Sequence, residues 1–360
     1  MARLLSAAGC HVVMADSLRH ALGFASGVHQ GTVRLPPFNA DPPVLAHVMQ
    51  AVIDDHAITH VLPTCEEVIY LARLWEVHRM NATLIAPDAA TLLSAHNKYQ
   101  FIEMARAAGV AVPRTWLMQS GDDPDEPNLP STALVYKPVW SRFGERVLIR
   151  PRRITFRPST QSPWVAQEYL HGDLCCAYAV ADAGKISACA IYHPLYPAGQ
   201  GGGTAFAPLD APDIADAVAA FAAYHRWTGQ LSFDVIRTET GPFFIECNPR
   251  ATSGLHLFEN GVSFADALFG QGQAMPVTVG LYGVRLAMAL YGVRWGRLRA
   301  LWHDLRRAQD VIAWQGDRVS ASRQLRAFAE IAGIAVRHRI SLQTASTYDI
   351  AWNGSEAETP

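Results

Sequence analysis

The chain has 360 residues, 50% of them hydrophobic, and a formal net charge of −2 at pH 7. This length and apolar fraction predict a globular protein of two or three domains rather than a disordered chain. The near-neutral charge excludes a general binder of nucleic acid or other polyanions. The six cysteines include no C-x-x-C pair and no zinc-type cluster, and no apolar run is long enough to span a bilayer. We therefore expect a cytoplasmic protein with reduced cysteines and no transmembrane segment.

Residues 1–92 show the alternation of helices and strands that is typical of a doubly wound α/β domain with a parallel sheet. Apolar spacing and turn residues predict a helix over 2–9, a strand over 10–17, a helix over 44–58, a strand over 59–65, a helix over 66–78 and a strand over 82–87. Because a helix precedes the first strand, we expect that this domain lacks its first strand, through truncation or a wrongly assigned start codon.

Residues 93–275 change to a pattern dominated by strands and turns, which predicts an α+β domain. The predicted elements are a capped helix ending at Gly109, a surface loop over 122–131, two strands around a loop over 133–151, strands over 164–170, 175–182 and 185–196, a glycine-rich loop over 198–206, a helix over 213–228 and a hairpin over 231–248. Residues 276–360 read as a third, mostly helical segment rich in Arg and Trp.

The hairpin sets polar side chains opposite one another. A five-residue loop over 238–242 places Asp234 directly opposite Glu246. In the same register Ser232 lies opposite Asn248. Side chains of the opposite parity point to the other face of the hairpin, toward a core, and these are Phe233, Val235, Ile245 and Cys247. One face of the hairpin is therefore apolar and the other is acidic.

Two carboxylates that face each other across a hairpin repel unless a cation, a shared proton or water compensates them. Asp234, Glu246 and Asn248 supply the two carboxylates and the amide oxygen that Mg²⁺ accepts, with phosphates and waters as further ligands. Arg250, two positions further on, would face the same site and stabilise an anionic or phosphorylated intermediate. The alternative is a solvent-exposed strand face on which the acids are simply hydrated.

Lysine is rare in this chain, since only Lys98, Lys137 and Lys185 occur among 30 basic residues. Lys137 ends a strand and precedes a loop that contains Ser141, which is typical of an ammonium group that reaches a phosphate. Lys98, beside the start of a helix, is a second candidate, whereas Lys185 is read as a surface residue. The alternative for each lysine taken singly is an ordinary surface position.

Four short strings, K-P at 137, Q-E-Y-L at 167–170, F-D at 233 and E-C-N-P-R at 246–250, occur in the order found in the ATP-grasp superfamily. Over roughly residues 10–275 the chain resembles this superfamily, and especially the branch of carbamoyl-phosphate synthetase large chains and biotin carboxylase. The resemblance implies an ATP-grasp fold, in which two lobes hold ATP between antiparallel sheets. Residues 1–92 would be the preceding α/β domain, residues 93–275 the ATP-grasp domain, and residues 276–360 a helical C-terminal segment.

The resemblance also implies site residues by position. They are Lys98 and Lys137 for the ATP phosphates, Gln167, Glu168 and Leu170 for the edge of the adenine, Asp234, Glu246 and Asn248 for Mg²⁺ or Mn²⁺, and Arg250 with Lys137 for the transferred phosphoryl group. Two positions depart from the pattern of the family. Asp173 is the nearest counterpart of the acid that contacts the ribose, and Ser141 with Arg142 would replace glycines of the phosphate loop.

The function that these residues favour is an ATP- and Mg²⁺-dependent ligase, which activates a small-molecule carboxylate as an acyl phosphate for attack by an amine or a similar nucleophile. A first alternative is a non-catalytic sensor that binds ATP without turnover. A second alternative is a peripheral membrane enzyme that acts on a lipid-like anionic substrate, with the Arg- and Trp-rich residues 285–307 at the membrane surface. In a simpler reading, those helices pack on the protein with their arginines outward. The sequence leaves the oligomeric state open, a homo-oligomer included.

Overall fold

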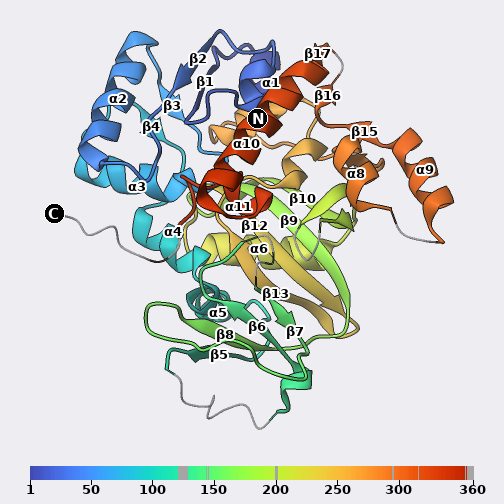
Figure 1. Cartoon of the computed structure of the whole chain (residues 1–360). Coiled ribbons are helices and arrows are strands. Elements are labelled where there is room, and N and C mark those ends of the chain that lie inside the picture. Colours follow the sequence, from blue (N-terminus) through green and yellow to red (C-terminus); the bar gives the residue numbers. More distant parts are fainter. Residues whose placement is uncertain are drawn as a thin grey trace.

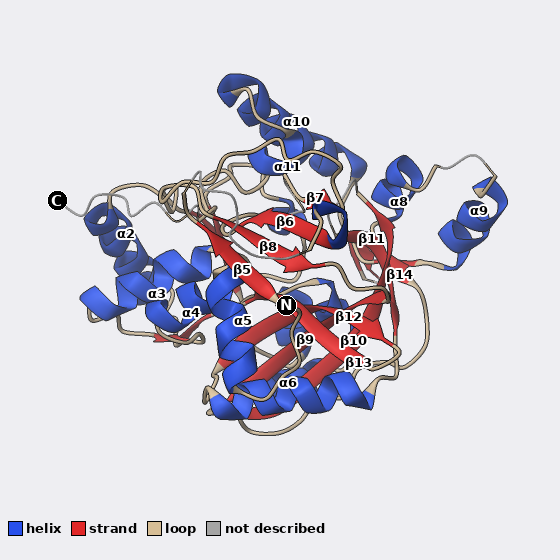
Figure 2. Cartoon of the chain, turned by 90° about the horizontal axis from the view of Figure 1, so that it is seen from below, coloured by secondary structure: helices blue, strands red, loops and turns tan. Residues whose placement is uncertain are grey.

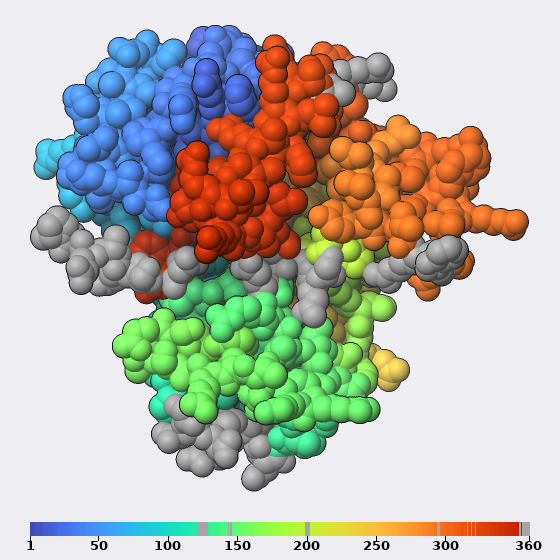
Figure 3. Space-filling model, viewed as in Figure 1, coloured from blue at the N-terminus to red at the C-terminus, as the bar shows by residue number. Residues whose placement is uncertain are grey.

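The computed structural model describes residues 1–120, 129–142, 144, 146–198, 202–293, 296–314, 316–352 and 354. Trp295, Gly201 and most of the expected surface loop over 122–131 lie outside these residues. The described chain is a mixed α/β structure with a large sheet at its centre, a smaller sheet below it and helices around both (Figure 1). Space-filling atoms show the small lobe as a separate lower mass, with the N- and C-terminal regions above it (Figure 3).

The N-terminal region contains two short pairs of parallel strands, flanked by helices. Its elements are α1 (Ala2–Ala7), β1 (Val13–Asp16), η1 (Leu22–Ala25), β2 (Gly31–Arg34), α2 (Pro42–Asp55), β3 (His60–Val61), α3 (Glu67–Val77) and β4 (Thr83–Leu84). Strand β1 pairs with β2, and β3 pairs with β4. The parallel pairing predicted from the sequence is present, but it forms two separate pairs instead of one continuous sheet in the described residues.

The small lobe is a four-stranded antiparallel sheet of order β5-β8-β6-β7. Its elements and the helices before it are α4 (Ala89–His96), α5 (Lys98–Ala107), β5 (Thr115–Met118), η2 (Ser131–Ala133), β6 (Leu134–Pro138), β7 (Leu148–Ile149) and β8 (Trp164–Glu168). The single helix expected before Gly109 is two helices, because Asn97 caps α5 by accepting the backbone N–H groups of Tyr99 and Gln100. This break places Lys98 at the start of α5.

Seven strands form the central sheet, in the order β13-β12-β9-β10-β11-β14-β15. This part of the chain comprises β9 (Asp173–Asp182), β10 (Lys185–Pro197), β11 (Gly203–Pro208), α6 (Pro212–Tyr224), β12 (Gly229–Thr238), β13 (Gly241–Asn248), η3 (Ser253–Leu257) and α7 (Gly261–Leu268). Side chains alternate along β9, so Ala177 and Ala179 pack in the core that contains α6, whereas Tyr178 and Val180 pack in the core that contains α7. Figure 2 shows α6 lying across one face of this sheet.

The C-terminal segment is attached to the rest of the molecule at several places. It comprises β14 (Tyr282–Gly283), α8 (Arg285–Tyr291), α9 (Leu298–Arg307), β15 (Gln309–Asp310), β16 (Ala313–Trp314), β17 (Asp317–Arg318), α10 (Ala321–His338) and α11 (Leu342–Ala345). Strands β14 and β15 extend the central sheet beyond β11. Arg3 Nε donates to Asp317 Oδ2 at 2.6 Å, which joins this segment to the N-terminal region. Among the described residues, no helix has both the length and the apolar character that crossing a membrane requires.

Gly229, the first residue of β12, offers a test of how the central sheet contacts the N-terminal region. Its φ is +100°, and an added Cβ would lie 2.9 Å from the carbonyl oxygen of Ile85. Gly109 also has a positive φ, of +74°, but an added Cβ there meets no atom within 4 Å. We expect Gly229→Ala to lower the free energy of unfolding by about 1–3 kcal/mol more than Gly109→Ala, as measured by urea denaturation. Equal losses of unfolding free energy in the two variants would show that the segment after β4 moves away without destabilising the protein.

Candidate functional site

Strands β12 and β13 place Asp234 directly opposite Glu246, and Ser232 directly opposite Asn248, as the sequence predicts. The predicted five-residue loop is wrong, because Thr238 already pairs with Gly241 and leaves a two-residue turn. A bulge next to Asp234 leaves one residue of β13 unpaired, and this extra residue restores the register at the polar end of the hairpin.

The same bulge changes which residue of β13 faces the core, so one predicted core position is wrong. Ile245, which was expected to face the core, is only partly buried, and Phe244 is fully buried in its place. Phe233, Val235 and Cys247 are buried as predicted.

The two opposed carboxylates have few compensating partners of their own. Asp234 accepts a weak hydrogen bond from the thiol of Cys176 at 3.3 Å. Burial and the neighbouring charge of Glu246 raise the pKa of Asp234 above its ordinary value. Glu246 lies 3.3 Å from the ammonium group of Lys98. Lys98 therefore offsets the charge of Glu246, whereas the thiol brings no charge to Asp234.

Two of the three lysines lie inside the protein beside these acids. Lys98 is 4% exposed and Lys137 is 6% exposed. Lys98 Nζ donates to the carbonyl oxygen of Ser141 at 2.6 Å, and Lys137 Nζ donates to Gln167 Oε1 at 2.9 Å. Burial lowers the pKa of Lys137 to about 8, although the charge of Glu246 opposes that shift. Neither lysine is a surface residue, whereas Lys185 is exposed, as expected.

Arg250 follows β13 and turns back toward the acids. One of its terminal nitrogens donates to Asn248 Oδ1 at 3.3 Å, and the other donates to the carbonyl oxygen of Ala251 at 3.2 Å. Its Nε is buried without a hydrogen-bond partner. The hydroxyl of Ser232 donates to the Arg250 carbonyl oxygen at 2.8 Å, which fixes the backbone where the chain leaves the sheet.

The residues expected at the adenine edge lie along the link between the two sheets, from the end of β8 to the start of β9. Gln167 is buried and holds Lys137, while its amide nitrogen donates to the hydroxyl of Thr115. The carboxylate of Glu168 accepts two hydrogen bonds from the exposed guanidinium of Arg114, at 3.0 and 3.1 Å. Leu170 is partly buried and Asp173 is exposed.

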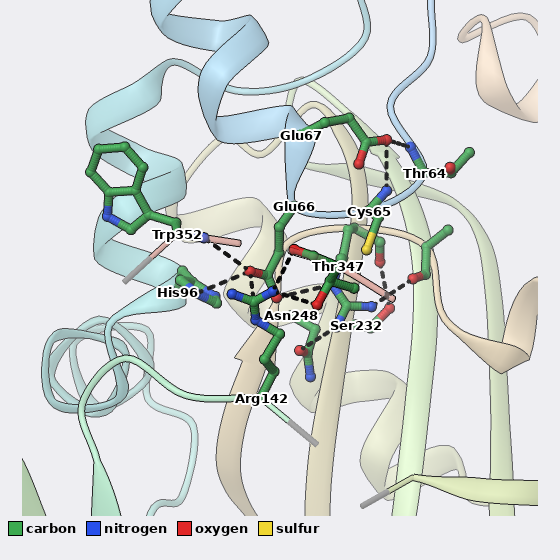
Figure 4. A network of polar contacts seen from close by, with 12 residues as sticks. Thr64, Cys65, Glu66, Glu67, His96, Arg142, Ser232, Asn248, Thr347 and Trp352 are labelled. Carbon is green, nitrogen blue, oxygen red and sulfur yellow. Dashed lines mark hydrogen bonds and ion pairs between the residues drawn. The ribbon is translucent and has the colours of Figure 1, made fainter. Parts of the chain in front are cut away.

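Glu66 is a buried carboxylate outside the predicted set. It lies beside residues from four other parts of the chain, which are His96, Arg142, Arg250 and Trp352. It lies in the segment after β3 and is 2% exposed. Its Oε2 is 3.1 Å from Arg142 Nε, and its Oε1 is 3.9 Å from Arg250 Nε. Arg142 also donates to the hydroxyl of Thr347 at 2.8 Å. Figure 4 shows Glu66 between His96, Arg142 and Trp352, with Asn248 and Ser232 below it.

At neutral pH the guanidinium groups of Arg142 and Arg250 balance the negative charge of Glu66. Burial alone would raise its pKa, but His96, Arg142 and Arg250 outweigh burial, so its pKa is lowered. Burial lowers the pKa of His96 itself to about 4, and His96 is therefore neutral near pH 7. The 3.9 Å contact between His96 and Glu66 is then no ion pair, and the two arginines hold the carboxylate ionised.

A cavity of about 220 Å³ opens in the small lobe beside Ser141, whose carbonyl oxygen holds Lys98. Its walls come from the loop after Lys137 and from the segment before β8. They are Pro138, Trp140, Ser141, Arg146, Gln161, Ser162 and Pro163. The cavity thus combines an aromatic ring, a guanidinium and two hydroxyls next to the buried lysines.

The predicted metal ligands fit a hard divalent ion by their chemistry. No group of three or more His, Cys, Asp or Glu side chains in the described ranges is arranged to hold a metal ion. Asp234, Glu246 and Asn248 provide two carboxylates and an amide on one face of the hairpin instead. Mg²⁺ is commonly bound by one or two carboxylates, with water and phosphate oxygens as its other ligands. The set therefore fits Mg²⁺ or Mn²⁺ together with an anionic ligand.

Sequence reasoning missed Glu66, His96, Thr347 and Trp352. A signal for Glu66 was present, because the chain reads P-T-C-E-E after the parallel strand β3. Sites in parallel α/β sheets lie beyond the carboxyl ends of strands. Thr347 and Trp352 had no such signal, since their contacts with this region are made from more than 200 residues away along the chain.

The family model described as "ATP-grasp domain" matches residues 95–254. None of the curated proteins matches this sequence. Many solved structures have a similar fold. An N5-carboxyaminoimidazole ribonucleotide synthetase in complex with ADP shows 12% identity and a TM-score of 0.60, covering 80% of this chain and 81% of its own.

The biotin carboxylase domain of 2-oxoglutarate carboxylase from Hydrogenobacter thermophilus, in complex with MgADP, ADP and bicarbonate, shows 13% identity and a TM-score of 0.54, covering 78% of this chain and 70% of its own. An L-amino acid ligase from Bacillus licheniformis shows 14% identity and a TM-score of 0.52, covering 72% and 74% respectively. At these identities the likeness is one of fold.

The contributions of Glu66 and of its neighbour Glu67 to the stability of the protein should change with pH in opposite directions. The lowered pKa of Glu66 means that its ionised form stabilises the protein above the ordinary value of 4.5, and this contribution is lost on acidification. Burial raises the pKa of Glu67, although its Oε1 accepts the backbone N–H groups of Thr64 and Cys65. Its ionised form therefore costs stability as the pH rises through its ordinary range.

We expect Glu66→Gln to lower the free energy of unfolding at pH 7 by about 3–5 kcal/mol, because two buried arginines lose their counter-charge. The loss should shrink when urea denaturation is repeated at pH 4. The matched variant Glu67→Gln should leave the stability at pH 7 unchanged or higher, because an amide oxygen can still accept both N–H groups. A loss for Glu66→Gln that stays constant between pH 4 and pH 7 would contradict an ionised Glu66.

Proposed function

We propose that this chain, whose residues 95–254 match an ATP-grasp domain, is an ATP- and Mg²⁺-dependent ligase that joins a small-molecule carboxylate to an amine or a similar nucleophile. The observation that carries this proposal is the convergence of Lys98, Lys137 and Arg250 on the opposed pair Asp234 and Glu246. Such a mixture of acids and fixed cations suits a triphosphate that carries a bound metal ion.

The metal would be held by Asp234, Glu246 and Asn248. When bound there, it would supply the positive charge that neutralises the phosphate oxygens during phosphoryl transfer. Lys98 and Lys137 would donate to phosphate oxygens from the side of the small lobe. With a pKa of about 8, Lys137 remains mainly protonated at pH 7 and can serve as a donor.

The reaction would proceed in two balanced steps. An oxygen of the substrate carboxylate attacks the γ-phosphorus of ATP, and the bond to ADP breaks with the electron pair leaving on ADP. The nucleophile then adds to the acyl carbon and inorganic phosphate departs, while the amine loses a proton to solvent or base. Arg250, whose Nε has no hydrogen-bond partner among the described residues, would bind the oxygens that gain charge in these steps.

No protein nucleophile is needed in this scheme. Burial raises the pKa of the thiols of Cys175, Cys176 and Cys247, so all three are protonated at neutral pH and poor nucleophiles. The nucleotide base would lie near the link between the two sheets, where Gln167, Glu168 and Leu170 are found. The cavity beside Ser141 is a place where part of the ligand can bind.

The proposed role of Glu246 can be tested with the full chain and Mg²⁺. We expect Glu246→Gln to lower ADP release at least about 100-fold, because a metal ligand and half of the acidic pair are lost. The control is Glu239→Gln, since Glu239 is an exposed acid in the turn of the same hairpin. ADP release is measured against a panel of carboxylic acids, each with a panel of amines.

The same assay separates the ligase from the ATP-binding sensor. A sensor would bind ATP, as measured by calorimetry, and would release no ADP with any pair of the panel. Equal turnover by wild type and by Glu246→Gln would overturn the proposed metal site. Turnover that requires a carboxylate but no amine would assign the nucleophile to another class.

A further inference from the structure

Helices α8 and α9 form a knob at the edge of the molecule, beyond β11 and β14 (Figure 2). We use the term α8–α9 knob for residues 285–293 and 296–307. The knob is a folded part of the protein. Met288 is fully buried against Ala205, and Tyr196 donates a hydrogen bond to Asp304. Its inner side is therefore fixed to the central sheet.

The outer side of the knob exposes large apolar side chains in pairs. Leu286 and Leu290 of α8 are 63% and 68% exposed, and Leu298 and Trp302 of α9 are 49% and 57% exposed. The members of each pair are four residues apart, so they lie on one side of their helix. Such a concentration of exposed Leu and Trp marks a surface that binds an apolar partner.

The same knob is strongly basic. Its exposed arginines are Arg285, Arg297, Arg299, Arg306 and Arg307. The guanidinium of Arg306 lies 3.2 Å from the centre of the Trp302 ring, so charge and apolar surface adjoin each other. Asp304 is the one acidic residue in the described part of the knob, and its carboxylate is bonded to Tyr196.

We propose that the α8–α9 knob binds the surface of an anionic lipid bilayer. Basic helices with exposed Leu and Trp lie in the interface of such membranes, because the apolar side chains enter the acyl boundary while the cations contact lipid phosphates. The charge of the knob complements anionic headgroups.

A second copy of the chain is a poorer partner for this surface. A twofold contact buries the same patch of both copies against each other, so the arginines of one knob would face the arginines of the other. Like charges without intervening acids repel, and Asp304 is already engaged. An anionic bilayer meets no such repulsion.

Flotation of the full chain with lipid vesicles tests the proposal. The probes are vesicles of phosphatidylcholine alone and vesicles of phosphatidylcholine with phosphatidylglycerol. We expect binding to the anionic vesicles, weaker binding at high salt, and little binding to phosphatidylcholine alone. Arg306→Glu/Arg307→Glu should weaken the partition coefficient at least about fivefold per arginine, and Trp302→Ser should weaken it as well.

Matched controls come from other exposed residues. Phe328 of α10 is 57% exposed, as Trp302 is, so Phe328→Ser controls for the loss of one exposed aromatic ring. Arg152 and Arg153 are a second pair of adjacent exposed arginines, so Arg152→Glu/Arg153→Glu controls for the change in net charge. Both controls should bind vesicles as the wild type does. Circular dichroism verifies that every variant remains folded.

Three results would overturn the proposal. The first is no flotation with anionic vesicles, and the second is flotation that the knob variants and the controls reduce equally. The third is a dimer in sedimentation equilibrium that Trp302→Ser dissociates, which would assign the surface to a second copy. None of these readouts depends on ATP turnover, so the proposal stands or falls separately from the ligase.

Discussion

Two carboxylates held opposite each other on neighbouring strands are the constraint on which the rest of the molecule depends. Asp234 and Glu246 repel each other, and three cations from different parts of the chain offset them. Lys98 begins α5, Lys137 ends β6, and Arg250 follows β13. The two sheets and the helix between them are thus brought together around one concentration of charge. In the proposed function, a metal-bound triphosphate would supply a cation for the two acids and an anion for the lysines and the arginine.

A second buried carboxylate extends this arrangement to the ends of the chain. Glu66 meets Arg142 from the small lobe and Arg250 from the central sheet, while Trp352 N lies 3.5 Å from its Oε2. A buried ion pair adds little stability compared with an apolar substitute, but removing one partner leaves a costly charge. In this protein the contact between Glu66 and Arg142 fixes the loop after Lys137 in one position relative to the N-terminal region.

The sequence predicts the acidic pair well because a strand has a two-residue period and the hairpin is local. The turn is predicted wrongly, yet a compensating bulge preserves the pairing of Asp234 with Glu246. The helix break at Asn97 and the split of the N-terminal strands depend on packing and capping that periodicity does not report. The contacts around Glu66 could not be predicted from the sequence. Arg142, which pairs with Glu66, also bonds Thr347, and no pattern links these two residues, which are 205 positions apart.

The contacts of Thr347 and Trp352 have a consequence for biosynthesis. These residues leave the ribosome after the whole central sheet, yet they complete the surroundings of Arg142 and Glu66. The indole of Trp352 also lies beneath the guanidinium of Arg73, at 4.2 Å, in the N-terminal region. A nascent chain that has not reached Ser341 therefore contains both lobes but lacks the contacts that Thr347 makes with Arg142 and that Trp352 makes with Glu66.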